Sequence, residues 1–219
     1  MEVEHASGGA AAAARSWDEL ATRYAGQERL EARAIAAALR LADPRPPDRV
    51  VDLATGTGLL LRALAARDPR PATATGVDRS AGMLAKVGRL PDEWCVIRGD
   101  ARCVPLPDGA ADVVTCCYLQ HLLGAEDRRR VLREARRLLS TAPGSRLVIA
   151  TVWANRDTIG GRMLNDLLPR LAAASPGRWG GLMPLDPTPE LGPAGLVATH
   201  RVLLPRGGYP SLVVRARVA

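Results

Sequence analysis

Short apolar runs alternate with segments of helical periodicity through the first two thirds of this 219-residue chain. In chain order, the apolar runs and the helical segments between them occupy residues 50–54, 59–66, 74–78, 80–89, 94–98, 111–117, 126–139 and 146–152. Runs that stay apolar, without a polar residue at every second position, are typical of strands buried on both faces. The alternation therefore predicts an α/β sandwich, in which helices cover both faces of a mostly parallel central sheet.

The first residues of the chain lie outside this alternation. Residues 1–14 are small and unpatterned, which predicts a flexible N-terminal tail. Residues 15–47 carry apolar residues at helical spacing and end in a proline-rich stretch, so we expect N-terminal helices there. A chain of this length fits one domain, and we place that domain at residues 15–219.

The last third of the chain also has its own pattern. Residues 153–190 contain a helical segment and then a glycine- and proline-rich stretch, which we interpret as an insert or lid over an acceptor site. Residues 197–204 and 211–218 flank a turn at 206–210. They are predicted to pair as antiparallel strands that close one edge of the sheet.

The charge of the chain is strongly basic, with a net charge of +7 and an isoelectric point of about 10.0, which suggests nucleic acid as a partner. However, Lys86 is the one lysine among the 30 basic residues, and phenylalanine is absent. A GC-rich genome produces such a composition without selection for a polyanion. The densest basic run, residues 128–137, turns most of its arginines outward and lacks aromatic residues for base stacking. Nucleic acid is therefore not the partner we expect.

The cysteines and histidines suggest neither a metal site nor a disulfide framework. The four cysteines include no C-x-x-C pair, and the three histidines lie far apart. The N-terminus has no basic region followed by an apolar core, and no stretch of about 18 apolar residues could span a membrane. We therefore expect a cytoplasmic protein without a membrane span, either a monomer or a weak homodimer.

A glycine-containing loop, Asp52-Leu53-Ala54-Thr55-Gly56-Thr57-Gly58, lies where the first apolar run meets the following helix. Glycines at such a junction let the backbone approach a ligand closely and leave the amides of the helix N-terminus free. A G-x-G pair alone is equally typical of a tight turn, so the interpretation depends on the residues around it.

Asp78 ends the second apolar run, about twenty residues after Gly58. A carboxylate there can accept hydrogen bonds from a ribose diol, in NAD as in other adenosine ligands. It could also cap the next helix, although Ser80 is placed for that task. Two residues disfavour a dinucleotide: Leu61 stands where the fingerprint has Gly or Ala, and Asp52 would repel a pyrophosphate but attract an ammonium group.

These segments form an ordered set with a known counterpart. The set resembles class I S-adenosylmethionine (SAM) dependent methyltransferases, in the ubiquinone/menaquinone-biosynthesis and small-molecule branch. The residues that carry the resemblance are 50–58, 76–78, 99–101, 112–114 and 138–152. The resemblance covers about residues 15–152 and, more faintly, the last strand pair. It implies a Rossmann-like fold, SAM as cofactor and S-adenosylhomocysteine (SAH) as product.

The resemblance also implies which residues bind the adenosine part of SAM. Asp78 would hold the ribose hydroxyls, and Arg79 and Met83 would flank the adenine. In Gly99-Asp100-Ala101, the Asp100 carboxylate would accept a hydrogen bond from the adenine amino group. The Ala101 amide would donate a hydrogen bond to a ring nitrogen.

The methionine part of SAM would be held by the loop Ala54-Thr55-Gly56-Thr57-Gly58, in which Ala54 replaces the commonest first glycine of the family. The resemblance further implies that Cys116 and Cys117 face the methionine and the sulfonium through backbone atoms. Tyr24 matches an N-terminal tyrosine that touches the SAM carboxylate, although it also fits a core aromatic position on an amphipathic helix.

Methyl transfer is an in-line displacement at a carbon that the sulfonium already activates. Alignment supplies much of the acceleration, about 7–11 kcal/mol in well-oriented intramolecular reactions. A general base helps where the acceptor is a phenol, an acid or an amine. His121 and Tyr118, just past the fourth apolar run, are the candidate catalytic residues, although His121 also fits a packing role. His200 better fits an edge strand.

Apolar residues near the N-terminus and in the insert could form the acceptor pocket or a packed core beneath a lid. These candidates are Trp17, Trp153, Met163, Leu167, Trp179 and Met183. We therefore expect methyl transfer from SAM to a small apolar or aromatic acceptor, with O-methylation ahead of N- or C-methylation. The composition and the resemblance suggest bacterial secondary metabolism or quinone biosynthesis as the setting.

Three alternatives stay open on the sequence. The acceptor could be RNA, in which case binding would weaken as salt rises. The chain could bind SAM as a regulator or for another reaction, without transferring a methyl group. The third alternative, an NAD-linked oxidoreductase, is disfavoured by Leu61.

Overall fold

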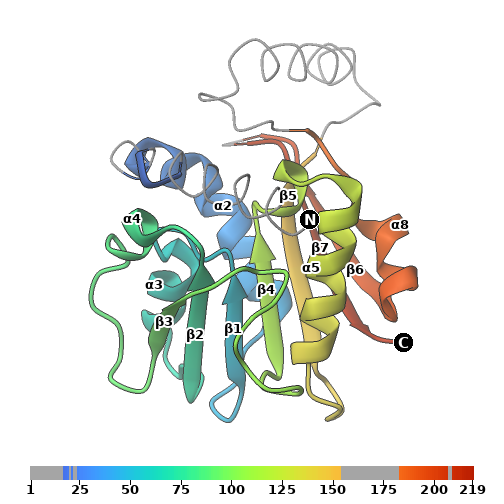
Figure 1. The fold of residues 1–219 in the computed structure, drawn as a ribbon, viewed down its shortest axis with the longest axis horizontal. Helices are drawn as coiled ribbons and strands as arrows, with labels where there is room; N and C mark the ends of the chain where they lie inside the picture. Colours follow the sequence, from blue (N-terminus) through green and yellow to red (C-terminus); the bar gives the residue numbers. More distant parts are fainter. Residues whose placement is uncertain (1–16, 20, 22–23, 154–182, 207–208) are drawn as a thin grey trace, which may run out of the picture.

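The computed structural model of this chain describes residues 17–19, 21, 24–153, 183–206 and 209–219. This part contains a seven-stranded sheet with helices on both faces (Figure 1). The predicted tail and most of the predicted insert lie outside the described residues, as do Met163, Leu167 and Trp179.

The strands lie in the order β3-β2-β1-β4-β5-β7-β6. Their bounds are Arg49–Leu53 for β1, Thr73–Asp78 for β2, Cys95–Arg98 for β3, Val113–Cys117 for β4, Arg146–Val152 for β5, Leu196–Leu204 for β6 and Ser211–Val218 for β7. β1 to β5 pair in parallel, whereas β7 is antiparallel to both of its neighbours. This arrangement confirms the predicted Rossmann-like sheet with its antiparallel C-terminal pair.

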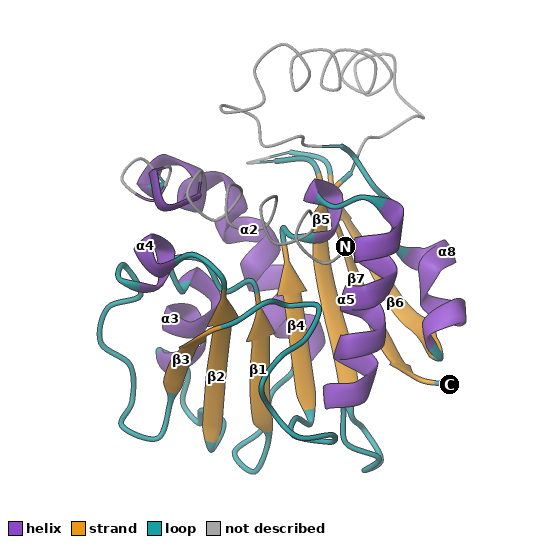
Figure 2. Ribbon diagram, in the orientation of Figure 1, coloured by secondary structure: helices purple, strands orange, loops and turns teal. Residues whose placement is uncertain are grey.

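Helices pack against both faces of the sheet (Figure 2). The described elements are α2 (Ala25–Ala42), α3 (Leu59–Ala65), α4 (Ala81–Leu84), η2 (Gln120–Leu122), α5 (Ala125–Leu138), α8 (Thr188–Leu191) and η3 (Gly192–Ala194). α2 and α3 contribute to the hydrophobic cluster on one face, and α5 and α8 contribute to the cluster on the other. The sheet is thus the middle layer of a three-layer sandwich.

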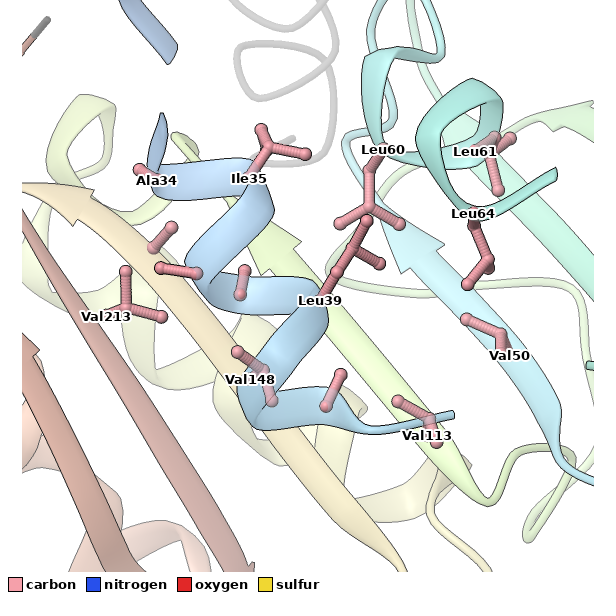
Figure 3. Packing of buried hydrophobic residues seen from close by; sticks show 14 of the residues in the cluster. Ala34, Ile35, Leu39, Val50, Leu60, Leu61, Leu64, Val113, Val148 and Val213 are labelled. Atoms are coloured by element: carbon pink, nitrogen blue, oxygen red, sulfur yellow. The ribbon is translucent and has the colours of Figure 1, made fainter. Parts of the chain in front are cut away.

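Adjacent residues of the central strands face opposite layers of this sandwich. Val50, Val113 and Val148 pack toward α2 and α3 (Figure 3), whereas Val51 and Val114 belong to the cluster beside α5. Full burial of an aliphatic side chain contributes about 1.5–3 kcal/mol. Burial on both faces explains why these strands are apolar at consecutive positions.

The sequence predicts that most of the six arginines of α5 point outward, whereas three of them are exposed and three are half-buried. Arg129, Arg130 and Arg133 are exposed, and all of them contact the Glu126 carboxylate at 3.1–3.3 Å. Exposed ion pairs contribute little stability, about 0–1 kcal/mol each. Their effect here is to offset the local positive charge with an acidic partner on the same helix.

The helix predicted at 80–89 is much shorter than expected, because α4 ends at Leu84. The Lys86 and Val87 amides donate to carbonyls three residues earlier, which tightens the chain out of α-helical geometry. Gly88 then adopts a φ of 79°. The apolar spacing of this segment therefore reflects the burial of Met83 and Val87, not a continuous helix.

The strand order reverses between β1 and β4. From β1 the chain continues to β2 on one side, and it later crosses to β4 on the other side of β1. In a sheet of this kind, a crevice opens at the carboxyl ends of the two strands where the order reverses. In Figure 1 the carboxyl ends of β1, β2 and β4 lie at the same edge of the sheet.

Candidate functional site

A cavity of about 440 Å³ occupies this crevice. Its volume lies within the range of about 300–1,000 Å³ that is usual for small-molecule sites. Fourteen of the site residues predicted from the sequence line it: Trp17, Tyr24, Asp52, Ala54, Thr55, Gly56, Asp78, Arg79, Met83, Gly99, Asp100, Ala101, Cys117 and Tyr118. The folded chain therefore brings together segments that are far apart in sequence.

Five predicted residues that the structure describes do not line the cavity: Gly58, Cys116, His121, Trp153 and Met183. The Cys116 side chain is buried in the cluster beside α5, and its burial raises the pKa of the thiol to about 12. Trp153 packs beside that same cluster, and Met183 is 59% exposed. His200 lies in the edge strand β6, as expected, and is exposed.

The loop after β1 adopts left-handed backbone conformations at three positions. Ala54, Gly56 and Gly58 have φ values of 56°, 56° and 78°. A residue other than glycine costs roughly 1–2 kcal/mol in this region. This cost explains why a glycine is commonest at the first position of the loop in the family that the sequence resembles. In this chain Ala54 adopts the left-handed conformation with a small side chain.

The two glycines of this loop have different surroundings. A Cβ at Gly56 would meet nothing within 4 Å, so its backbone faces open space in the cavity wall. A Cβ at Gly58 would lie 2.7 Å from Cγ1 of Val87, which leaves no room for a side chain. Gly56 therefore permits a ligand to approach the backbone, whereas Gly58 permits close packing beneath the loop.

Asp78 connects the loop to the end of β2. Its Oδ2 accepts a hydrogen bond from the Gly56 amide at 2.9 Å, and its Oδ1 accepts one from the Ser80 amide at 2.9 Å. Ser80 itself caps α4 through its Oγ, so Asp78 is not needed for that cap. Burial raises the pKa of Asp78, against the lowering effect of both amides. A carboxylate can accept further hydrogen bonds, and Asp78 lines the cavity with that capacity.

Asp52 lies beneath the same loop and is 2% exposed. The Thr115 hydroxyl donates to its Oδ1 at 2.7 Å. Burial raises the pKa of Asp52 to about 6, against the lowering effect of the hydrogen bond from Thr115. A positively charged group nearby would stabilise the charged form of this buried carboxylate, so the contact predicted for an ammonium group stays a prediction.

Asp100 is tied to a neighbouring arginine. Its Oδ1 accepts hydrogen bonds from the amide and Nε of Arg102, both at 2.9 Å, and Arg102 also contacts Asp127 at 2.9 Å. Burial acts to raise the pKa of Asp100, but these bonds and the guanidinium charge hold it below its usual value. The sequence did not single out Arg102 and Asp127, which also line the cavity.

Glu31, in α2, is a further lining residue that the sequence analysis missed. The Tyr24 hydroxyl donates to its Oε1 at 2.8 Å. Burial raises the pKa of Glu31 to about 7, against the lowering effect of this hydrogen bond. A signal was present, because Glu31 shares one helical face with the buried Ala34, Ile35 and Ala38.

Tyr118 follows β4 with a φ of 58°. Its hydroxyl lies 2.8 Å from Oγ of Ser211, and because that Oγ donates to the Tyr209 carbonyl, the Tyr118 hydroxyl is the donor. Burial raises the pKa of Tyr118 far above its usual value. Its proton is thus both engaged and firmly held, which is unsuitable for a base at neutral pH.

His121 is 5% exposed, and its Nδ1 lies 3.5 Å from the donating amide of Val152. Burial lowers the pKa of this imidazole to about 3. A base of that pKa binds protons too weakly for general-base work near pH 7. The geometry gives His121 the packing role that its sequence position also allowed, with its ring edge-on to Tyr118 at 5.9 Å.

Two kinds of site are not found among the residues that the structure describes. They contain no cluster of three or more histidine, cysteine or acidic side chains that could hold a metal ion. In the same part of the chain, no helix is long and apolar enough to cross a membrane.

Comparison with known proteins agrees with this geometry. The family described as "Methyltransferase domain" matches residues 50–142. A demethylmenaquinone methyltransferase from Mycobacterium marinum is 35% identical over 173 residues, which is 74% of this chain and 70% of that protein. Similar proteins with the same name, from Thermotoga maritima (40% identical over 47% of this chain) and Thermus thermophilus (39% over 51%), are matched over 43% and 50% of their own lengths. The chain thus spans about half of these two curated relatives.

Solved structures show the same fold. The methyltransferase in the complex with the Haloferax volcanii Trm112 activator superposes with a TM-score of 0.71, at 20% identity over 93% of this chain and 96% of that one. Magnesium protoporphyrin IX methyltransferase from Synechocystis, solved with bound SAH, has a TM-score of 0.63 at 18% identity over 89% and 84%. Together with the Mycobacterium marinum relative, these matches establish that the chain belongs to the class I SAM-dependent methyltransferase family.

Proposed function

We propose that this chain transfers a methyl group from SAM to a small aromatic acceptor of the quinone type. The observation that carries the proposal is the cavity at the strand-order reversal, where Gly56 opens the loop backbone and Asp78 offers carboxylate oxygens. Curated relatives named demethylmenaquinone methyltransferase support the class of acceptor.

The residues present fit SAM at this site. The positive φ at Gly56, with open space where its Cβ would be, suits close approach of the methionine part to the backbone. Asp52 offers negative charge for the ammonium group, and Asp78 offers acceptors for the ribose hydroxyls. When bound there, SAM supplies a methyl group on a positively charged sulfur. The chain itself has to orient the acceptor and exclude water from it.

The apolar part of the cavity wall supports an aromatic acceptor. Its lining includes Trp17, Ile35, Leu59, Leu60, Leu119, Leu122 and Leu123. An acceptor like that of the relatives would receive the methyl group on a ring carbon. This ranks C-methylation ahead of the O-methylation that we expected from the sequence alone.

The first experiment measures thermal unfolding with SAH, and with NAD as the control. A ligand at 100 times its Kd stabilises a protein by about 2.7 kcal/mol, which for a chain of this size is roughly 5–10 °C. A shift with SAH alone agrees with the proposed cofactor. A shift with NAD alone would contradict it.

The second experiment incubates the protein with methyl-labelled SAM and a reduced, short-chain demethylmenaquinone. Label in the quinone product, found on carbon by mass spectrometry, is the expected result. Simple phenols and bulk tRNA serve as comparison acceptors. Preferential labelling of tRNA would overturn the small-molecule assignment, and SAH binding without transfer to any acceptor would overturn the enzymatic one.

A further inference from the structure

Glu31 places a buried carboxyl group in the wall of the cavity. It is 7% exposed, and it lies on α2 beside Ala34 and Ile35, which are buried. We propose that Glu31 is the general base of the reaction and accepts the proton that the acceptor loses when it is methylated. This inference rests on the proposed function, because it concerns the acceptor of that same methyl transfer.

The surroundings of Glu31 differ from those of Glu134, another buried glutamate of the chain. The Tyr24 hydroxyl is its described hydrogen-bond donor, at 2.8 Å from Oε1. Among the residues that the structure describes, no arginine or lysine forms an ion pair with it. By contrast, Glu134, which is equally buried, is held by Arg137 at 2.6 Å. Glu31 is therefore a buried carboxyl group that has no positively charged partner among the described residues.

The titratable groups that interact electrostatically with Glu31 come from several elements. They are Tyr24 just before α2, Glu28 in its first turn, Cys117 from β4, Tyr118 from the loop after it, and Tyr209 from the connection between β6 and β7. None of them is a cation. The site thus has one carboxyl group surrounded by phenols, a thiol and a second carboxylate, and it can take up a proton without losing a salt bridge.

Glu31 reaches the cavity from a different element than the carboxylates beside the glycine loop. Asp52 and Asp78 lie at the ends of β1 and β2, beside the glycine loop, whereas Glu31 comes from α2 and interacts electrostatically with Cys117 and Tyr118 at the end of β4. The class resemblance assigns the end of β4 to the sulfonium. On this inference, the Glu31 carboxylate faces the place where the acceptor must lose its proton.

The proton balance of the step is simple. The nucleophilic atom of the acceptor forms a bond to the methyl carbon while the methyl–sulfur bond breaks, and the electron pair of that bond stays on sulfur. The O–H or ring C–H proton of the acceptor passes to the Glu31 carboxylate. One positive and one negative charge disappear together, and no oxidant or further reactant is required.

The proton affinity of Glu31 agrees with this role. Burial raises its pKa to about 7, the hydrogen bond from Tyr24 lowers it, and the charge of Glu28 raises it further. A general base works best when its pKa is near the working pH. The two candidates from the sequence lie on either side of this range, because the pKa of His121 is lowered to about 3 and that of Tyr118 is raised far above 10.

The first test compares Glu31→Gln with the wild type. Glutamine keeps the shape and the oxygen that Tyr24 needs, but it cannot take up the proton. We expect kcat to fall by roughly 100- to 10,000-fold, the usual contribution of a general base. The KM for SAM and the thermal shift with SAH should stay within about twofold of the wild type, because the carboxyl group serves the acceptor.

The pH profile separates a base from a residue that only supports the fold. For the wild type, kcat should rise with pH to a plateau, with its midpoint near pH 7. Glu31→Gln should lose this rise of kcat with pH. Glu31→Asp should recover part of the activity and again show a rise of kcat with pH. The matched control is Glu28→Gln, one turn earlier, whose carboxylate contacts Arg62 and Thr57 and does not line the cavity. The plateau value of kcat for Glu28→Gln should equal that of the wild type, and the midpoint of the rise in kcat should move to lower pH.

A further measurement needs no substrate. In cofactor-free protein labelled with 13C at glutamate carboxyl groups, one NMR signal should titrate near pH 7 and be absent from Glu31→Gln. Stability gives a second sign. The folded pKa of Glu31 exceeds its unfolded value, so its contribution is present below pH 4.5 and is lost as pH rises through 7. The melting temperature of Glu31→Gln minus that of the wild type should therefore increase as the pH is raised from 4 to 8.

The outcomes distinguish this inference from the proposed function. An active wild type with an equally active Glu31→Gln would overturn the role of Glu31 and leave the methyltransferase assignment intact. Loss of the SAH shift in Glu31→Gln would also overturn it, because the carboxyl group would then serve cofactor binding through Tyr24. A wild type that binds SAH but methylates no acceptor would overturn the proposed function, and this inference with it.

Discussion

The two sides of the cavity are built in different ways. On the cofactor side, the loop after β1, Asp78 at the end of β2 and residues 99–101 after β3 each follow directly from a strand of the parallel sheet. On the acceptor side, Glu31 comes from the N-terminal helix α2 and Tyr118 from the loop after β4, and Tyr118 is held by Ser211 of β7. The first side is a set of short local segments, and the second is an assembly of distant ones.

This difference has a chemical consequence. The proposed cofactor side presents backbone groups and the carboxylates of Asp52, Asp78 and Asp100, in positions that the strand ends determine. The acceptor side presents side chains whose identities are free to change without disturbing the strands. We therefore expect substitutions on the first side to affect SAH binding and substitutions on the second to affect acceptor turnover.

The largest effect should come from Asp78→Ala, which tests the cofactor side directly. It would remove the two charged hydrogen bonds that we propose Asp78 makes with the ribose, worth roughly 2 kcal/mol each. We expect SAH binding to weaken by about 1,000-fold, measured by calorimetry. Asp92→Ala, at an exposed position outside the cavity lining, is the control and should leave the affinity unchanged. An unaltered Kd of Asp78→Ala for SAH would contradict the proposal that Asp78 binds the ribose.

The next effect separates the two glycines of one loop. Gly58→Ala should lower the free energy of unfolding by about 3 kcal/mol, because φ is 78° and the new Cβ would lie 2.7 Å from Val87. Adding Val87→Ala should recover part of that loss. Gly56→Ala has the same kind of strain but no neighbour within 4 Å, so it should cost only about 1 kcal/mol of stability.

SAH binding should rank the same two variants in the opposite order. The Gly56→Ala methyl group projects into the cavity, so calorimetry should find weaker SAH binding for it than for Gly58→Ala at a temperature where both are folded. Equal losses of affinity would mean that the two glycines share one function, against the contacts described here.

Much of the cofactor side was predictable because its signals are local. The apolar runs identified β1, β2, β4 and β5, and the bounds of β5 were predicted residue for residue, because strands buried on both faces contain few polar residues. Asp78, which was predicted as a site residue from its place at a strand end, lines the cavity. By contrast, helical spacing predicted too long a helix at 80–89, because spacing reports burial and does not detect the tight turn after Leu84.

The acceptor side was predictable only in part, for a physical reason. Tyr118 and Ser211 are 93 residues apart and meet because β7 pairs beside β5, which no local pattern encodes. The resemblance implied that both vicinal cysteines face the ligand through backbone atoms, but only Cys117 lines the cavity, and Cys116 is buried in the cluster beside α5. Glu31 left a signal, an acidic residue on an apolar helical face, that the sequence analysis did not use.

A smaller effect concerns the stability that the chain loses in acid because of His121. The folded pKa of this imidazole, about 3, lies below its unfolded value of 6.5, so the unfolded chain binds more protons in that interval and stability falls as the pH falls. At pH 5 this costs about 2 kcal/mol relative to neutral pH. His121→Asn keeps an acceptor for the Val152 amide and should lose this part of the pH dependence, measured by urea unfolding at pH 7 and pH 5. An unchanged slope would show that the imidazole is protonated in the folded chain.

The smallest effect distinguishes support from chemistry on the acceptor side. Tyr118→Phe removes the hydrogen bond to Ser211, which should cost about 1 kcal/mol of stability. Ser211→Ala removes the same bond from the other end, so the double variant should cost about 1 kcal/mol less than the sum of the single ones. In a urea series this coupling is measurable, while kcat at pH 8 should stay within about twofold, because the Tyr118 proton is held too firmly for transfer. A kcat loss as large as that of Glu31→Gln would instead make Tyr118 part of the proton path, and the acceptor side would then work through two residues in series.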